Sequence, residues 1–331
     1  SFLLIVLVFI LVFMNNNDNN NINIKIFNHN GVVRQYVYHG PDKKQGNKQP
    51  LIAVIPNSGE FTSSTIELLQ YNNIADQNNF GVVYPLGMIV QEGDSNSNSG
   101  PGSSGDSRYR RFNVNYNGDS NSKATDDDSD FIMDLMLYIS SEYSFDINKL
   151  FVTGYGNGGD MCYILACKYS NLLSAISSVA GTMYESVKLS KYCNEPDTMQ
   201  LAKNSPIYSI HGKIDQYTKW DGGISIGNGI DATSNGPYMS QINILNYWKE
   251  RYDCIVMNTN TISNEGIGNS GINKLKYSSC HQGGSIINNP IDSTNSQLWL
   301  DEVIDGDHNY NLYGTNEKTS KAVWDFFQLY I

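Results

Sequence analysis

The stretch Lys149-Leu-Phe-Val-Thr-Gly-Tyr-Gly-Asn-Gly-Gly159 decides the fold of this chain. It begins with a short apolar run typical of a buried strand, and residues 161–169 beyond it have helical composition. Gly154, Gly156 and Gly159 lie between the two segments, where glycine permits a tight turn that other residues disfavour. The stretch therefore predicts a strand, a sharp turn and a helix in succession.

These three glycines have the G-x-G-x-x-G spacing of a dinucleotide-binding turn, in which a helix N-terminus holds a pyrophosphate. In that fold an acidic residue near the end of the next strand holds a ribose hydroxyl. Here the next predicted strand ends in Ala180-Gly181, and Glu185 lies outside it. Nucleotide binding through Gly154, Gly156 and Gly159 is therefore only a second alternative.

The competing interpretation is a nucleophile elbow, G-x-S-x-G, in which a strained residue projects its side chain from the sheet. The matching residues are Gly154 to Gly158, so Gly156 occupies the nucleophile position. Asp215 and His308 each follow a later predicted strand, which gives the order nucleophile, acid and base of an α/β-hydrolase. Judged alone, Asp215 is also consistent with a residue that caps a turn, and His308 with a solvated loop histidine. The prediction of an acid and a base therefore rests on their joint order after Gly156.

Strands alternate with helices along the whole chain and predict one α/β domain with a mostly parallel sheet and helices on both faces. Ser64 and Glu67 have capping-box spacing at the start of one helix. The polar segment 94–126 is too long for an ordinary connection and predicts a large surface loop, either a flap over the site or an expanded insertion. The predicted strands are 32–38, 50–55, 80–84, 149–153, 174–180, 206–210 and 298–304, and the predicted helices are 64–75, 131–143, 161–169, 242–252 and 319–330.

With these motifs, the chain resembles the secreted esterase family that includes polyhydroxybutyrate depolymerase-like proteins and feruloyl and acetyl-xylan esterases. The resemblance runs from about Val33 to the C-terminus and rests on the shared order of short motifs. It implies an α/β-hydrolase fold, a Ser-His-Asp triad, a carboxylic ester substrate, secretion and no cofactor, and Asp215 and His308 match the family's acid and base. The matching stretches are 50–55, 75–85, 128–131, 143–148, 154–167, 179–181, His211-Gly212 with Asp215, Trp248 before Cys254, and 306–308.

Two departures from the family pattern concern the chemistry. Gly156 stands where the family has serine, and glycine has no atom that attacks an acyl carbon. After the first buried strand the family has His-Gly, which contributes an oxyanion-hole N–H, whereas this chain has Pro56, which has no N–H. We therefore expect an oxyanion region made of Asn57, Ser58 and Asn157 with one donor missing.

The sequence thus predicts an α/β-hydrolase-fold protein that lacks turnover and binds an ester or a plant or microbial glycan in the old pocket. The alternative is an active carboxylic ester hydrolase with altered machinery, in which Ser58, Tyr155 or Cys162 replaces the serine. None of these three residues occupies the elbow position with a base beside it.

Composition excludes other classes of protein. The chain has 331 residues, of which 40% are hydrophobic and 17% charged, which is enough apolar material for one large core. Its formal net charge of -11 opposes contact with phosphate backbones, and the cluster Arg108, Arg110 and Arg111 is short and lies among acidic neighbours. We expect a monomer with no nucleic-acid partner, no cofactor and no metal.

The N-terminal region has the features of a targeting segment and not of a folded domain. Residues 1–14 contain an apolar run of the size of a signal-peptide h-region, too short to cross a hydrocarbon core of about 30 Å. We interpret this run as a secretion signal, with a retained signal anchor or a buried strand as alternatives. Residues 15–31 are predicted as an Asn-rich linker and 32–331 as the α/β-hydrolase domain. No Asn has the spacing of an N-glycosylation site.

The five cysteines fit an oxidising compartment with two disulfides and one free thiol. We predict that Cys167 pairs with Cys193 and Cys254 with Cys280, which is one of three possible pairings of four residues. Each bridge is expected to join a loop to a neighbouring helix. Cys162, inside the helix that follows the elbow, is then a buried free thiol.

Overall fold

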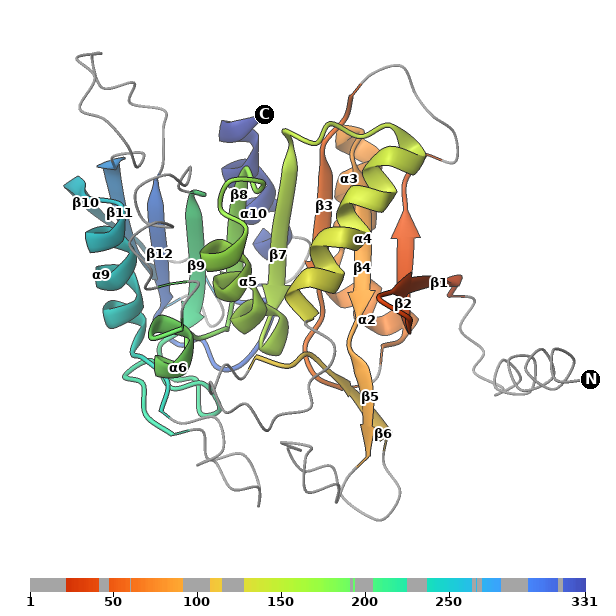
Figure 1. Ribbon diagram of the computed structural model, residues 1–331. Coiled ribbons are helices and arrows are strands. Elements are labelled where there is room, and N and C mark those ends of the chain that lie inside the picture. The colour runs from red at the N-terminus through yellow and green to blue at the C-terminus, as the bar shows by residue number, and fades with distance from the viewer. Residues whose placement is uncertain are drawn as a thin grey trace, which may run out of the picture.

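A sheet of ten strands runs through the described part of the chain in this computed structural model (Figure 1). The structure describes residues 22–41, 48–59, 61–91, 108–114, 128–190, 193, 205–224, 237–263, 266, 270–280, 297–314 and 318–331. The predicted secretion segment 1–14 lies outside these residues, as does most of the polar segment 94–126.

The central strands of the sheet are parallel and the outer ones antiparallel. Each of the six strands from β4 to β12, in the order given below, is parallel to its neighbours within that group. The outer pairs are antiparallel. This arrangement confirms the predicted α/β class with a mostly parallel sheet. The order is β1 (Ile24–His29), β2 (Val32–His39), β4 (Gly81–Leu86), β3 (Leu51–Ile55), β7 (Leu150–Tyr155), β8 (Ala175–Val179), β9 (Ile207–Gly212), β12 (Leu298–Val303), β11 (Ile272–Cys280) and β10 (Cys254–Ile262).

Helices cover both faces of the sheet (Figure 1), so its central strands are buried along almost their whole length. Every residue of β3, β4 and β9 is buried. One face carries α4 (Asp128–Tyr143), α5 (Asn157–Lys168) and α9 (Gln241–Arg251), and the other carries α3 (Tyr71–Asn78) and α10 (Lys318–Phe327) (Figure 1). These two layers hold the hydrophobic core, and α6 (Glu185–Lys188) and a 3-10 helix at Gln328–Tyr330 are short additions.

The sheet begins earlier than predicted, because β1 lies inside the predicted linker 15–31. Residues of β1 pair with β2 in register from Ile24 opposite Val37 to His29 opposite Val32. The two strands are joined by Asn30 and Gly31, whose φ angles of 51° and 85° suit a two-residue hairpin turn. The Asn-Gly pair that marks this turn was hidden by the surrounding Asn-rich composition.

A second hairpin, β10 and β11, is missing from the sequence prediction. It forms one edge of the sheet, and most residues of β10 are exposed. An exposed edge strand has no apolar face to bury, so Asn and Thr residues gave it no strand periodicity. Cys254 lies opposite Cys280 in this hairpin, and the two form one of the predicted disulfides. The bridge therefore joins two neighbouring strands, and our expectation of a loop joined to a helix was wrong for this pair.

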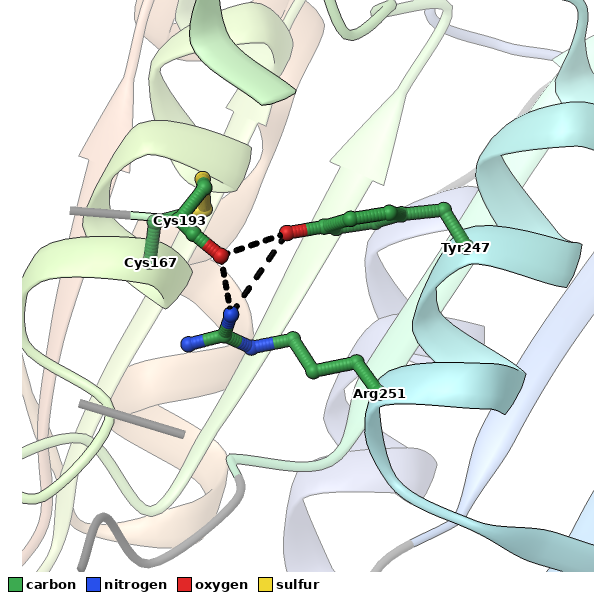
Figure 2. The surroundings of a disulfide bond; sticks show 4 residues. All are labelled: Cys167, Cys193, Tyr247 and Arg251. Atoms are coloured by element: carbon green, nitrogen blue, oxygen red, sulfur yellow. Dashed lines mark hydrogen bonds between the residues drawn. A yellow bond between two sulfur atoms is a disulfide. The ribbon is translucent and has the colours of Figure 1, made fainter. Parts of the chain in front are cut away.

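The other predicted disulfide joins Cys167, near the end of α5, to Cys193 (Figure 2). Two side chains of α9 also bind Cys193. The Tyr247 hydroxyl donates to the Cys193 carbonyl oxygen at 3.0 Å, and Arg251 Nη1 donates to the same oxygen. Cys162 is buried and free, as expected. The bridge and the two hydrogen bonds together hold Cys193 between α5 and α9.

Other boundaries differ locally from the prediction. The predicted helix 64–75 is two helices, α2 (Ser63–Leu69) and α3, separated by Gln70 in the left-handed region at φ 54°. The capping box is made by Thr62 and Thr65 rather than by Ser64 and Glu67. β4 continues through Pro85, and beyond it β5 (Met88–Gln91) and β6 (Arg108–Arg111) form a separate two-stranded sheet.

A buried carboxyl group lies in the first turn of α5. Asp160 Oδ1 accepts a hydrogen bond from the Thr182 N–H at 2.7 Å. Burial raises the pKa of Asp160 to about 7, because desolvation disfavours the charged form more than the Thr182 N–H and the charges of His308 and Arg111 favour it. The folded chain therefore carries a carboxyl that is neutral at mildly acidic pH.

We predict that Asp160 makes the chain less stable as the pH rises toward 7. The pKa of an unperturbed Asp is 3.8, so the folded state binds the extra proton between that value and about 7. The free energy of unfolding therefore falls with rising pH, by at most about 1.4 kcal/mol per pH unit for this group. Asp160→Asn keeps the acceptor for Thr182 and should remove this contribution. Urea unfolding at several pH values checks it, and an unchanged slope in the variant would contradict it.

We also predict that the Cys167–Cys193 bridge contributes substantially to stability. The two cysteines are 26 residues apart, and closing a loop of that length stabilises a fold by about 3 kcal/mol. Replacing both with Ala should lower the free energy of unfolding by about that amount in urea titrations. Cys162→Ala is the matched control because it removes a buried thiol without opening a loop, and it should cost about 1 kcal/mol. Equal losses in the two variants would refute the loop argument.

Candidate active site

The carboxyl ends of four parallel strands bring the predicted site residues to one edge of the sheet. Asn57 follows β3, Gly156 follows β7, Asp215 follows β9, and His308 follows β12. Parallel strands all end at the same edge, so segments far apart in the sequence meet there. The sequence prediction placed each of these residues after a strand, and the topology places those strand ends along one edge.

Gly156 is the one residue between β7 and α5, and its backbone has a conformation that favours glycine. Its φ of 52° and ψ of -117° lie where residues with a side chain are disfavoured. Its N–H donates to the Val179 carbonyl oxygen at 2.9 Å, and its carbonyl oxygen accepts the Asp160 N–H, so the turn is anchored to β8 and to α5. The turn thus has the order of strand, turn and helix that the predicted nucleophile elbow requires, and Gly156 is its central residue.

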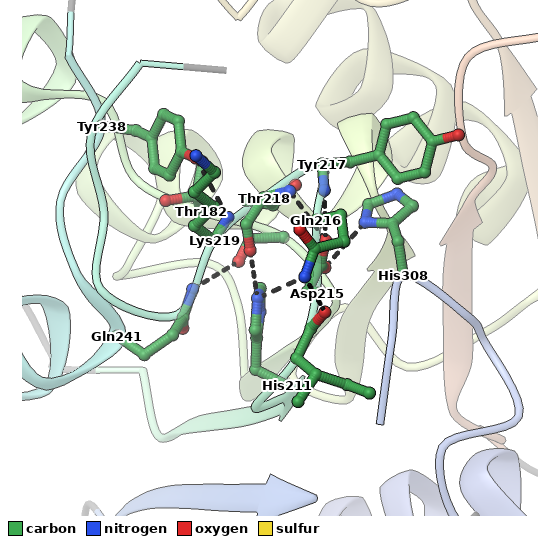
Figure 3. Close-up of polar contacts among 12 residues, drawn as sticks. Thr182, His211, Asp215, Gln216, Tyr217, Thr218, Lys219, Tyr238, Gln241 and His308 are labelled. Atoms are coloured by element: carbon green, nitrogen blue, oxygen red, sulfur yellow. Dashed lines mark hydrogen bonds and ion pairs between the residues drawn. The ribbon is translucent and has the colours of Figure 1, made fainter. Parts of the chain in front are cut away.

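Asp215 and His308 are directly hydrogen-bonded (Figure 3). His308 Nδ1 lies 2.8 Å from Asp215 Oδ2, so the ring N–H donates to the carboxylate. Asp215 is buried, and its Oδ1 accepts the N–H groups of Tyr217 and Thr218, each at 2.8 Å. The Tyr155 hydroxyl donates to the His308 carbonyl oxygen at 3.1 Å, which ties His308 to the last residue of β7. The acid and base expected from the sequence are therefore brought together beside the elbow.

A second imidazole contacts the same carboxylate. His211 Nε2 lies 3.4 Å from Asp215 Oδ2 and 2.6 Å from the Thr218 carbonyl oxygen, to which it donates (Figure 3). Burial lowers the pKa of His211 although the Asp215 charge opposes the shift, so the ring is held neutral. We did not predict His211 as a site residue. Its position four residues before Asp215 is the feature of the sequence that could have indicated it.

Asn57 occupies the space beside Gly156. Its Oδ1 accepts the N–H of Ser58 at 2.8 Å and the N–H of Asn157 at 3.0 Å. A Cβ built on Gly156 would lie 2.4 Å from that oxygen, well inside contact distance. The Asn57 carboxamide therefore lies where a side chain at position 156 would project.

Pro56 itself has no N–H, and the backbone donors found in this part of the site come from other residues, so the predicted loss of an oxyanion donor stays a prediction. Two backbone N–H groups, from Ser58 and Asn157, converge on one acceptor. The donor on the β3 side comes from Ser58, two residues beyond Pro56, so the missing N–H of the proline does not affect the pair. The Asn157 N–H at the start of α5 donates to Asn57 and is therefore not free for another acceptor in this conformation.

The Asn157 side chain holds a neighbouring segment against the elbow. Its Oδ1 accepts the Phe112 N–H at 2.9 Å, and its Nδ2 donates to the Phe112 carbonyl oxygen at 3.2 Å. Gly59 and Arg110 exchange both of their backbone hydrogen bonds nearby. Residues 108–114, the described part of the predicted surface loop, are therefore fixed beside the site.

The three residues considered as replacements for the serine are poorly placed for that role. Cys162 is buried in α5, and burial raises its pKa well above the usual value for a thiol. Burial also raises the pKa of Tyr155 to about 12, and its hydroxyl is bonded to the backbone of His308 rather than to the ring. Ser58 is exposed, and its N–H is the group that contacts Asn57.

No group of three or more His, Cys, Asp or Glu residues in the described part of the chain is arranged to hold a metal ion. None of the helices in the described ranges has the length and apolar character needed to cross a membrane.

Comparisons with known proteins point to esterases. Over 156 residues, 46% of this chain, it is 25% identical to feruloyl esterase B of Talaromyces funiculosus, and the match spans only 38% of that relative's length. No family model matches the chain.

Two solved structures share the fold at low sequence identity. The acetyl xylan esterase from Aspergillus awamori is similar with a TM-score of 0.55 and 13% identity, over 93% of this chain and 99% of that one. The S-formylglutathione hydrolase from Agrobacterium tumefaciens is similar with a TM-score of 0.53 and 12% identity, over 93% of this chain and 95% of that one. The chain therefore has the α/β-hydrolase fold of esterases.

Proposed function

We propose that this chain is an esterase-type α/β-hydrolase-fold protein that does not hydrolyse esters and instead binds an ester or glycan ligand at the former active site. The observation that carries the proposal is the elbow, where position 156 has no side chain and the Asn57 carboxamide occupies its space. A glycine in the elbow cannot form an acyl-enzyme.

In this proposal Asp215 and His308 are the remaining acid and base of a triad. The Asp215 carboxylate orients the imidazole through Nδ1, which is the role of the acid in a serine hydrolase. Position 156 has no hydroxyl that passes a proton to that imidazole. Loss of the nucleophile alone lowers kcat on the order of a millionfold in a serine hydrolase.

The alternative, an active hydrolase with altered machinery, would require His308 to activate water directly. A tetrahedral intermediate formed that way carries a negative oxygen that needs hydrogen-bond donors. The N–H groups of Ser58 and Asn157 are the available pair, and both already donate to Asn57. This occupancy supports the inactive assignment over the alternative.

We place the protein outside the cell. Two disulfides fit an oxidising compartment, and the predicted secretion signal agrees with it. The ligand we propose is an ester or a plant or microbial glycan, because the formal net charge of -11 disfavours polyanions. The protein acts as a monomer in this proposal.

Purified protein should hydrolyse aryl and feruloyl esters no faster than its His308→Ala variant, because a base without a nucleophile contributes nothing to acyl transfer. Initial rates with p-nitrophenyl acetate and methyl ferulate measure this. An active feruloyl esterase in the same buffer is the positive control. A clear excess of activity in the unmutated protein over His308→Ala would overturn the proposal.

Tyr217 should contribute to ligand binding. Its side chain is 56% exposed, and its ring centroid lies 5.3 Å from that of His308, so it offers an aromatic surface at the site. Tyr217→Ala should weaken the binding of a feruloylated oligosaccharide about tenfold in calorimetric titration. Tyr138→Ala, which removes an exposed tyrosine on α4, is the matched control and should leave binding unchanged. Equal affinity in all three proteins would place the ligand elsewhere.

A further inference from the structure

We infer that Asn57 is an internal plug of the ligand site. Its carboxamide takes the position of an acyl group, and a ligand carbonyl or carboxylate reaches the Ser58 and Asn157 N–H groups only after Asn57 rotates away. The inference rests on the proposed function because it assigns the access and the chemistry of that same site.

The first observation is the double hydrogen bond to one oxygen. The Ser58 and Asn157 N–H groups come from segments 100 residues apart and meet Asn57 Oδ1 at 2.8 Å and 3.0 Å. A carboxamide oxygen has two lone pairs, so both acceptor positions are in use. The side chain is therefore held by the elbow and by its own loop together.

The second observation is steric. A Cβ on Gly156 would lie 2.4 Å from Asn57 Oδ1, 2.6 Å from its Cγ and 2.8 Å from its Nδ2. All three distances are too short for non-bonded atoms, so this Asn57 conformation excludes any side chain at position 156. Gly156 thus does more than remove a nucleophile, because it makes the room that the plug occupies.

The chemistry of the Asn57 carboxamide indicates which ligands compete with it for the Ser58 and Asn157 N–H groups. The occupant is planar, and an sp² oxygen accepts both hydrogen bonds. A carboxylate accepts hydrogen bonds more strongly than a neutral carboxamide, so a ligand with a free carboxylate is the stronger competitor and an ester carbonyl the weaker one. Asn57 is only half-buried and Ser58 is exposed, which leaves room for the side chain to turn outward.

A double-mutant cycle tests the plug. Gly156→Ser is made in the unmutated protein and in the Asn57→Ala background, and two quantities are measured: the change in Tm and the rate at which a fluorophosphonate labels the introduced serine. We expect a smaller loss of Tm and at least about tenfold faster labelling in the Asn57→Ala background, because the donors are then free. The backbone strain of a serine at a φ of 52° is the same in both backgrounds and cancels.

Asn28→Ala is the matched control for the cycle. Asn28 Oδ1 also accepts a backbone N–H, from Gly31 at 2.9 Å, but in an exposed hairpin turn. Gly156→Ser should therefore have the same effect on Tm with and without Asn28→Ala. Equal Tm losses and equal labelling rates with and without Asn57→Ala would refute the plug.

A titration with acetate tests the plug without any change at position 156. Acetate should shift the Ser58 and Asn157 amide resonances at about tenfold lower concentration in Asn57→Ala than in the unmutated protein. Equal midpoints would refute the plug. Ester hydrolysis by the unmutated protein would instead refute the proposed function, but it would not change the expected results of the mutant cycle and of this titration. Failure of the proposed function and failure of the plug are therefore distinguishable.

Discussion

The backbone of β3, β7 and the start of α5 approach so closely that no side chain fits between them, and the rest of the site depends on this contact. A Cβ on Gly158 would lie 2.1 Å from the Ile55 carbonyl oxygen, and one on Gly154 would lie 2.2 Å from the Gly158 carbonyl oxygen. Glycine at these two positions therefore permits the close packing of β3, β7 and α5. The same contact places the end of β3 against the elbow, which puts Asn57 beside Gly156.

The acid and base remain aligned because backbone groups hold them. The carboxylate of Asp215 is fixed by the Tyr217 and Thr218 N–H groups, and burying it without these partners would be unfavourable. His308 Nδ1 donates to the other carboxylate oxygen, Asp215 Oδ2. Such an arrangement stabilises the loop after β9 whether or not a reaction takes place, so it can outlast the loss of a nucleophile. Intact acid and base are consequently weak evidence for activity, and our proposal of an inactive protein rests on Gly156 instead.

The sequence was informative wherever local pattern and structure coincide. Buried parallel strands, the glycine turn and the order of Asp215 and His308 were all predicted, because apolar runs and special backbone positions appear directly in the sequence. The hairpin of β10 and β11 was missed because an exposed edge strand buries no apolar face. The role of Asn57 could not be predicted, since it depends on a rotamer and on an N–H that lies 100 residues away. The contact between the Ser58 N–H and Asn57 could not be predicted either, since it too depends on the Asn57 rotamer.

The central claim is that the elbow has exchanged a nucleophile for an internal carboxamide, and a high-resolution crystal structure of the unmutated protein tests it most directly. We expect Asn57 Oδ1 to lie within hydrogen-bond distance of both the Ser58 and the Asn157 N–H, with no water between them. Electron density that shows Asn57 turned outward, with ordered water on these two N–H groups, would contradict it.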